Sequence, residues 1–228
     1  MGLARESEIH GRLFWIRPML IELACGTGLA WLYLWETVDA GLHQWVAHGI
    51  PLNIVPPSGT LHAQFAAHAV LISFLIAATF IDFDEKTIPD WITIPGTLLG
   101  LLLAASLPSS QLPDFAVPMG VLAPAFLRLV PELGAPAWIY GAYGLLVGVL
   151  CLVGWWYALL PKLFYFRGGI VKAIRFFFAK ALRYRFTFYL TVLFLLSASF
   201  TAAVWTWGTP DRWLALLSAL IGMAFGGA

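Results

Sequence analysis

Four carboxylates stand close together in one short polar stretch of a largely apolar chain. Asp82, Asp84, Glu85 and Asp90 fall within nine consecutive positions, although the 228-residue chain has only 12 acidic residues. The apolar run 63–81 leads directly into this stretch, and a second apolar run leaves it. Carboxylates are costly beside a bilayer core and are usually kept there for a purpose. Groups of this type can act as general acids and bases.

Asp82 is the first candidate for such a role. It follows the apolar run 63–81 with no spacer and stands between Ile81 and Phe83. We therefore expect its side chain at the boundary of the membrane and not in free solvent. One carboxyl does not make a hydrolase, because aspartic chemistry uses two carboxyls that share one proton. Asp82 by itself therefore indicates a functional carboxyl and does not predict a hydrolase.

The other acids of the stretch also have a purely structural interpretation. Thr87 could cap the following helix, with Pro89 in its first turn and Asp90 three positions after the cap. A carboxylate at that position is stabilised by free backbone N–H groups and by the helix dipole. Asp84 and Glu85 could be solvated loop charges.

The composition indicates an integral membrane protein. The chain is 61% hydrophobic and 11% charged, whereas a soluble domain is roughly half apolar and about a quarter charged. We predict an all-α, polytopic transmembrane bundle that forms one membrane domain, 1–228. It would comprise a cytoplasmic N-terminus at 1–17, a core at 18–108 and further spans in 109–228. Six spans are predicted, at roughly 18–35, 63–81, 91–108, 137–160, 186–207 and 212–228.

The basic residues predict the orientation of these spans. Eleven of the 13 Lys and Arg residues lie in 1–17, 82–90 and 161–185. Because basic residues favour the cytoplasmic side, the N-terminus and Asp82 are expected there. Segment 161–185 has seven basic residues, no acidic ones and many aromatic ones. Part of the segment, roughly 170–185, is predicted to form an amphipathic helix in the cytoplasmic interface. Anionic lipid would bind the basic segment 161–185, and nucleic-acid binding is not predicted.

No metal or cofactor site is predicted. His43, His48, His62 and His68 lack the i, i+4 spacing that places two ligands on one helical face. The two cysteines do not form a C-x-x-C pair. We expect His68 to pack inside a span against a polar partner. Glu22, four residues into a span, is interpreted as a structural contact at the interface.

Two motifs resemble a known family. The first motif lies between two membrane spans: one residue separates Asp82 from Asp84, and Pro89 and Asp90 follow after four more residues. This motif resembles the first catalytic-aspartate region of the type IV prepilin peptidases. These are polytopic aspartic endopeptidases of the bacterial inner membrane. The segment 17–26, an Arg-Pro pair followed by an apolar-Glu-Leu pattern, resembles the span-opening segment of the family. The resemblance covers roughly residues 12 to 105.

The resemblance implies a function and roles for residues. Asp82 matches the first catalytic aspartate of the family, and Asp84, Pro89 and Asp90 match the supporting loop. The substrate would be a prepilin or pseudopilin precursor, cut after a Gly at the end of a short basic leader. A water molecule would be activated at the cytoplasmic interface by Asp82 and a partner carboxyl.

The chain also departs from the family. The second catalytic aspartate of the family lies in a Gly-x-Gly-Asp motif, which this chain lacks, as it lacks the cysteine-rich region linked to methyltransferase activity. We expect the chain to be a fragment of a longer peptidase, with that motif after Ala228. One alternative is an inactive homologue that acts as an assembly or scaffold protein of a pilus or secretion system. Another is a transporter-like protein that uses Asp82 and Glu22 as coupling carboxylates.

Overall fold

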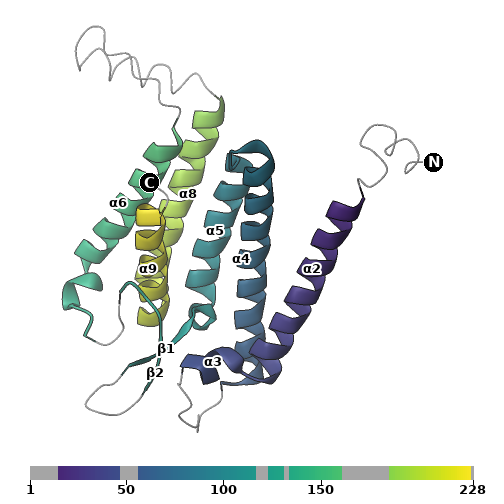
Figure 1. Cartoon of the computed structure of the whole chain (residues 1–228). Coiled ribbons are helices and arrows are strands. Elements are labelled where there is room, and N and C mark those ends of the chain that lie inside the picture. The colour runs from purple at the N-terminus through teal and green to yellow at the C-terminus, as the bar shows by residue number, and fades with distance from the viewer. Residues whose placement is uncertain (1–14, 47–55, 117–122, 131–133, 161–184, 227–228) are drawn as a thin grey trace. The chain divides into compact units, whose positions relative to one another are not determined.

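The structure is a computed structural model that describes residues 15–46, 56–116, 123–130, 134–160 and 185–226 (Figure 1). Most of the described residues are helical, as the apolar segments predict. The chain divides into two compact units, Met1–Ser73 and Phe74–Ala228, and the boundary falls inside one long helix.

The first unit is built from helices joined by a π-helical turn. Its elements are α2 (Ile16–Tyr33), the π-helix η1 (Leu34–Val38), α3 (Gly41–Val46) and the first part of α4 (Ser58–Glu85). No residue of α2 is buried, so polar and aromatic contacts at its C-terminal end connect it to the rest of the unit. The π-helix continues the helical path to Val38, beyond the predicted end at 35.

The described residues of the second unit form the rest of α4, four further α-helices, two short 3-10 helices and a small hairpin. Its elements are α5 (Asp90–Ser106), η2 (Pro108–Ser110), β1 (Pro113–Ala116), β2 (Ala123–Phe126), η4 (Ala137–Ile139), α6 (Ala142–Leu159), α8 (Arg185–Trp207) and α9 (Pro210–Gly226). The strands are antiparallel, with Pro113 opposite Phe126. The sequence analysis did not predict this hairpin. Each strand has only four residues and contains proline, so neither shows the alternation of apolar and polar residues that marks a strand.

Helix α9 forms the core of the second unit. Leu214, Leu216, Leu217 and Leu220 are almost completely buried, where α9 packs against α5 and α6. On α6, a Cβ added at Gly148 would lie 3.3 Å from Leu220 Cδ1. Glycine therefore permits the close approach of two helices, as small residues do at membrane helix interfaces.

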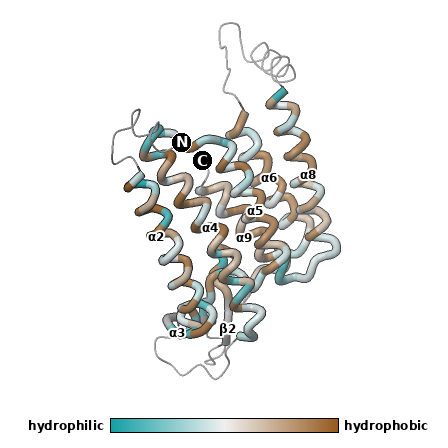
Figure 2. The backbone as a smooth tube through the Cα atoms, turned by 90° about the vertical axis from the view of Figure 1, so that its right-hand side faces the viewer, coloured by the Kyte–Doolittle hydropathy of each residue, from teal (hydrophilic) through white to brown (hydrophobic). Residues whose placement is uncertain are grey.

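Four of the described helices are long and apolar enough to cross a membrane, which indicates a membrane protein (Figure 2). They are Ile16–Val38, Ser58–Glu85, Ala142–Leu159 and Arg185–Trp207. Of the six predicted spans, the described structure therefore supports only these four. Helices α5 and α9 have 17 residues each, which is about 25 Å at 1.5 Å per residue, less than the roughly 30 Å hydrocarbon core. The predicted interfacial helix lies outside the described residues, except for Arg185, the first residue of α8.

Candidate functional site

The acidic stretch forms the end of α4 and the turn into α5. Helix α4 ends at Glu85, and Lys86 follows with a positive φ of 54°. The Lys86 N–H donates a hydrogen bond of 2.7 Å to the Asp82 carbonyl. This bond is the usual closure of a helix by a left-handed residue. It places Asp82 in the last turn of α4.

The acidic side chains at this turn are exposed. The side chains of Asp82, Asp84 and Asp90 are all exposed. The carboxyl of Asp82 is therefore accessible to a reactant, and the described chain does not hold it in an apolar pocket.

Helix α5 begins differently from the prediction. Pro89, in an extended conformation, precedes the first helical residue, Asp90. The carbonyl of Pro89 accepts a hydrogen bond from the Ile92 N–H at 3.0 Å. Thr87 is therefore too early in the chain to cap this helix, and the predicted cap was wrong. Asp90 remains in the first turn, where the helix dipole favours a carboxylate.

A groove starts one turn after Asp90. It has a volume of about 540 Å³, and its lining is mostly apolar, with Thr93 and Thr97 from α5. Leu159 from the last turn of α6 and Gly226 from the last turn of α9 also line it. The C-terminal ends of α6 and α9 therefore reach the same end of the second unit as Asp90 (Figure 1).

The acidic residues later in the chain lie elsewhere. Asp211 lies in the first turn of α9 and pairs with Arg128 Nη1 at 2.6 Å. Arg128 Nη2 also donates to the Pro108 carbonyl at 3.4 Å, just after α5 ends. Asp211 therefore lies at the other end of α5 from Asp90, roughly 25 Å away along the helix. Asp114 is on β1, which follows that same far end of α5, and Glu132 lies outside the described residues.

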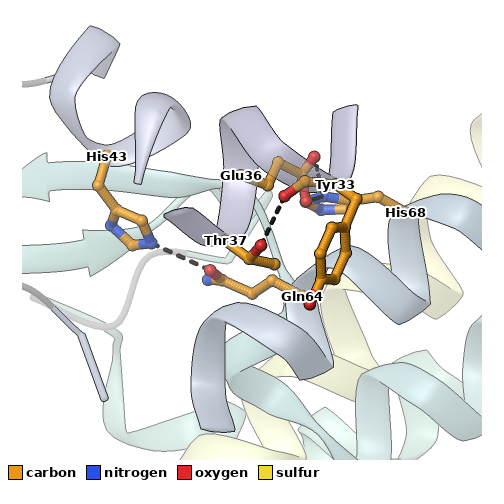
Figure 3. Close-up of polar contacts among 6 residues, drawn as sticks. All are labelled: Tyr33, Glu36, Thr37, His43, Gln64 and His68. Carbon is orange, nitrogen blue, oxygen red and sulfur yellow. Dashed lines mark hydrogen bonds and ion pairs between the residues drawn. The ribbon is translucent and has the colours of Figure 1, made fainter. Parts of the chain in front are cut away.

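A second polar group, which the sequence did not predict as a site, lies in the first unit (Figure 3). Glu36 on η1 is only 5% exposed. Both of its carboxylate oxygens contact His68 Nδ1 on α4, at 2.9 and 3.0 Å. His43 Nε2 of α3 lies 3.0 Å from Gln64 Oε1 of α4, in a second buried contact.

The polar partner expected for His68 is confirmed, and it is Glu36. The first predicted span ends at residue 35, so the sequence analysis left Glu36 outside the span. The π-helical turn instead keeps it on the helix. The two residues are 32 positions apart, so no local pattern could pair them. Among the described residues, no group of three His, Cys, Asp or Glu side chains is placed to hold a metal ion.

Glu22, a further acid of the first unit, is exposed on α2. Comparison with protein-family models, with curated proteins and with solved structures finds no match for this chain.

Proposed function

We propose that the chain supplies the first catalytic carboxylate, Asp82, of a prepilin-type aspartic endopeptidase. The observation that carries the proposal is the position of Asp82, exposed in the last turn of a 28-residue apolar helix. A carboxyl there can meet both water and a peptide that emerges from a membrane. The motif resemblance supports the same residue.

The chemistry requires two carboxyls at one place. Asp82, as the ionised member, would accept a proton from a water molecule, which attacks the scissile carbonyl carbon. The second carboxyl would first polarise the carbonyl and then give its proton to the leaving amine. Because Asp114 and Asp211 lie at the far end of α5, the partner must come from elements at the Asp90 end. The last turns of α6 and α9 are described elements that reach this end.

The charges of the turn suit the proposed substrate. Asp84 and Glu85 follow Asp82 at the end of α4, Asp90 begins α5, and all three are exposed. Such a negatively charged segment attracts a basic leader. The proposed substrate is a prepilin or pseudopilin precursor, in which an apolar helix follows this leader. The proposal places the turn on the cytoplasmic face of a bacterial inner membrane, with anionic lipid bound at 161–185.

Conservative substitutions test the proposal. A precursor with a basic leader, a Gly and an apolar helix is reconstituted in vesicles with the full-length protein. We expect Asp82→Asn to reduce cleavage by at least about 1,000-fold, as removal of a catalytic group does. Glu22→Gln, at an exposed carboxylate of α2 away from this turn in the sequence, is the matched control and should retain cleavage. Cleavage by Asp82→Asn at the unchanged rate would refute the assignment, and a wild-type protein without activity would favour the scaffold alternative.

A further inference from the structure

The apolar groove of the second unit is lined by one face of each of three helices. On α9, Ala219, Met223 and Gly226 line it at intervals that place them on one face of the helix. Helix α9 packs against both α5 and α6, and these two helices supply the rest of the lining. On α5 the lining extends from Thr93 to Leu101, a rise of about 12 Å at 1.5 Å per residue. The groove is therefore as long as about two turns of a helix.

The groove contains small residues that the packing of the described chain does not require. Gly100 on α5 and Ala158 on α6 line it and are exposed. A Cβ added at Gly100 would meet no described atom within 4 Å, whereas at Gly148 it would meet Leu220. Glycine inside a helix is destabilising relative to alanine, and close packing within the chain does not explain it at Gly100. Such small residues allow a second helix to approach closely.

The groove also has polar atoms near its Asp90 end. Thr93 and Thr97 line it there, and the Thr93 hydroxyl donates to the Asp90 carbonyl at 3.4 Å. A hydroxyl that donates can still accept a hydrogen bond. The first N–H groups of a helix have no partner within that helix and are costly to leave unsatisfied in lipid. The N-terminus of a helix can therefore use these hydroxyls, whereas a lipid acyl chain has no polar atom for them.

Charge and polarity change along the groove in the order of the proposed substrate. The exposed carboxylates of Asp82 and Asp90 lie at the turn where α5 begins, and the mostly apolar lining starts at Thr93. A prepilin-like precursor has its basic leader first and its apolar helix directly after the cut. We propose, on the basis of the peptidase function above, that the groove docks the first two turns of this apolar helix. The N-terminus of the helix lies at the Asp90 end, which places the scissile peptide beside the acidic turn.

Photo-crosslinking to the Asp82→Asn variant tests the docking without catalysis. A leucine that bears a diazirine is placed in the second turn of the precursor helix, and this precursor is bound to the full-length variant in nanodiscs. We expect crosslinks to residues of the groove, such as Thr97, Ala158 and Met223. A diazirine about 20 Å further along the helix, or four turns, should lose these crosslinks. Crosslinks confined to lipid or to α2 would overturn the proposal.

Filling the groove tests the docking by kinetics. Gly100→Leu and Ala158→Leu each add an apolar side chain to the groove and should raise the KM of the precursor by about tenfold or more. Gly100→Ala adds only the Cβ for which the described chain has room, so it should fold and give a smaller increase in KM. Val153→Phe is the matched control, because Val153 is exposed on the opposite face of α6, and its KM should stay at the wild-type value. A soluble leader peptide without the apolar helix should bind equally to all four variants.

Failure of the docking and failure of the peptidase assignment give different results. A wild-type KM in both leucine variants, while Asp82→Asn is inactive, would overturn the docking and leave the peptidase proposal standing. Full cleavage by Asp82→Asn together with crosslinks in the groove would refute the role of Asp82 and support the docking. Native mass spectrometry detects a bound lipid. Loss of such a lipid from the leucine variants with no change in KM would show that the groove binds lipid, and would overturn the proposal.

Discussion

Asp82 and Glu36 both lie near the end of an apolar helix, yet their surroundings are opposite. Asp82 is exposed at the end of α4. Glu36 is 5% exposed and contacts His68 through both carboxylate oxygens. A buried charge needs a partner, whereas an exposed charge is stabilised by water. The exposed carboxylate is the one that can meet an external substrate, whereas the buried carboxylate is already engaged by a partner within the fold.

The comparison predicts different costs of substitution. The largest loss of stability is expected for His68→Leu, because it leaves the Glu36 charge buried without a partner. We expect a decrease of roughly 3–5 kcal/mol in the free energy of unfolding. The double variant Glu36→Leu/His68→Leu should recover most of this loss, since the uncompensated charge is gone. Thermal unfolding in nanodiscs measures both, and equal losses in the two variants would argue against a charge pair.

His43→Leu should have a smaller effect. It removes the buried contact with Gln64 Oε1 without leaving a net charge behind. The loss of a neutral hydrogen bond typically costs about 0.5–1.5 kcal/mol, or somewhat more when a buried group is left unsatisfied. The same unfolding measurement should therefore rank His43→Leu below His68→Leu. The reverse order would show that an unpaired buried charge is not what makes substitution of His68 costly.

The turn after α4 tests backbone geometry at the exposed site. Lys86 has a φ of 54°, a conformation that glycine adopts freely and a β-branched residue resists. Lys86→Gly should leave stability unchanged or raise it by up to about 1 kcal/mol, and Lys86→Val should lower it by about 1–2 kcal/mol. Both variants remove the charge, so the difference between them isolates the backbone. Equal stabilities would contradict a left-handed residue at this position.

Glu85→Gln should have the smallest effect. Glu85 is exposed in the last turn of α4, where the helix dipole disfavours a negative charge. A change below about 0.5 kcal/mol is expected, with a slight gain in stability. A loss as large as that of His68→Leu would show that the turn is not the exposed region described above.

The sequence predicted best those helices that depend only on the length and hydropathy of an apolar run. The apolar runs predicted the helices that became α2, α4, α6 and α8, because length and hydropathy are local properties. Helix α4 begins at Ser58, five residues before the predicted start at 63. These added residues are mostly polar or small, and a hydropathy criterion excludes them.

Features set by distant contacts were not predictable. The residues around Glu36 in the sequence do not indicate that the chain continues as a π-helix, which brings the Glu36 carboxylate to His68. The cap of α5 was also misjudged, because Thr87 and Pro89 both fit the pattern of a helix start, and the left-handed Lys86 decides where α4 ends. Asp82 was placed correctly at a helix end, since an abrupt change from apolar to charged residues marks that end.

Leader cleavage by Asp82→Asn and Glu36→Gln, measured in parallel with their unfolding temperatures, tests the central comparison most directly. We predict that Asp82→Asn loses cleavage by at least about 1,000-fold while its unfolding temperature stays within a few degrees of wild type. Glu36→Gln should lower the unfolding temperature and still cleave wherever it remains folded. Full cleavage by Asp82→Asn, or loss of cleavage in a folded Glu36→Gln protein, would contradict the assignment of chemistry to the exposed carboxylate.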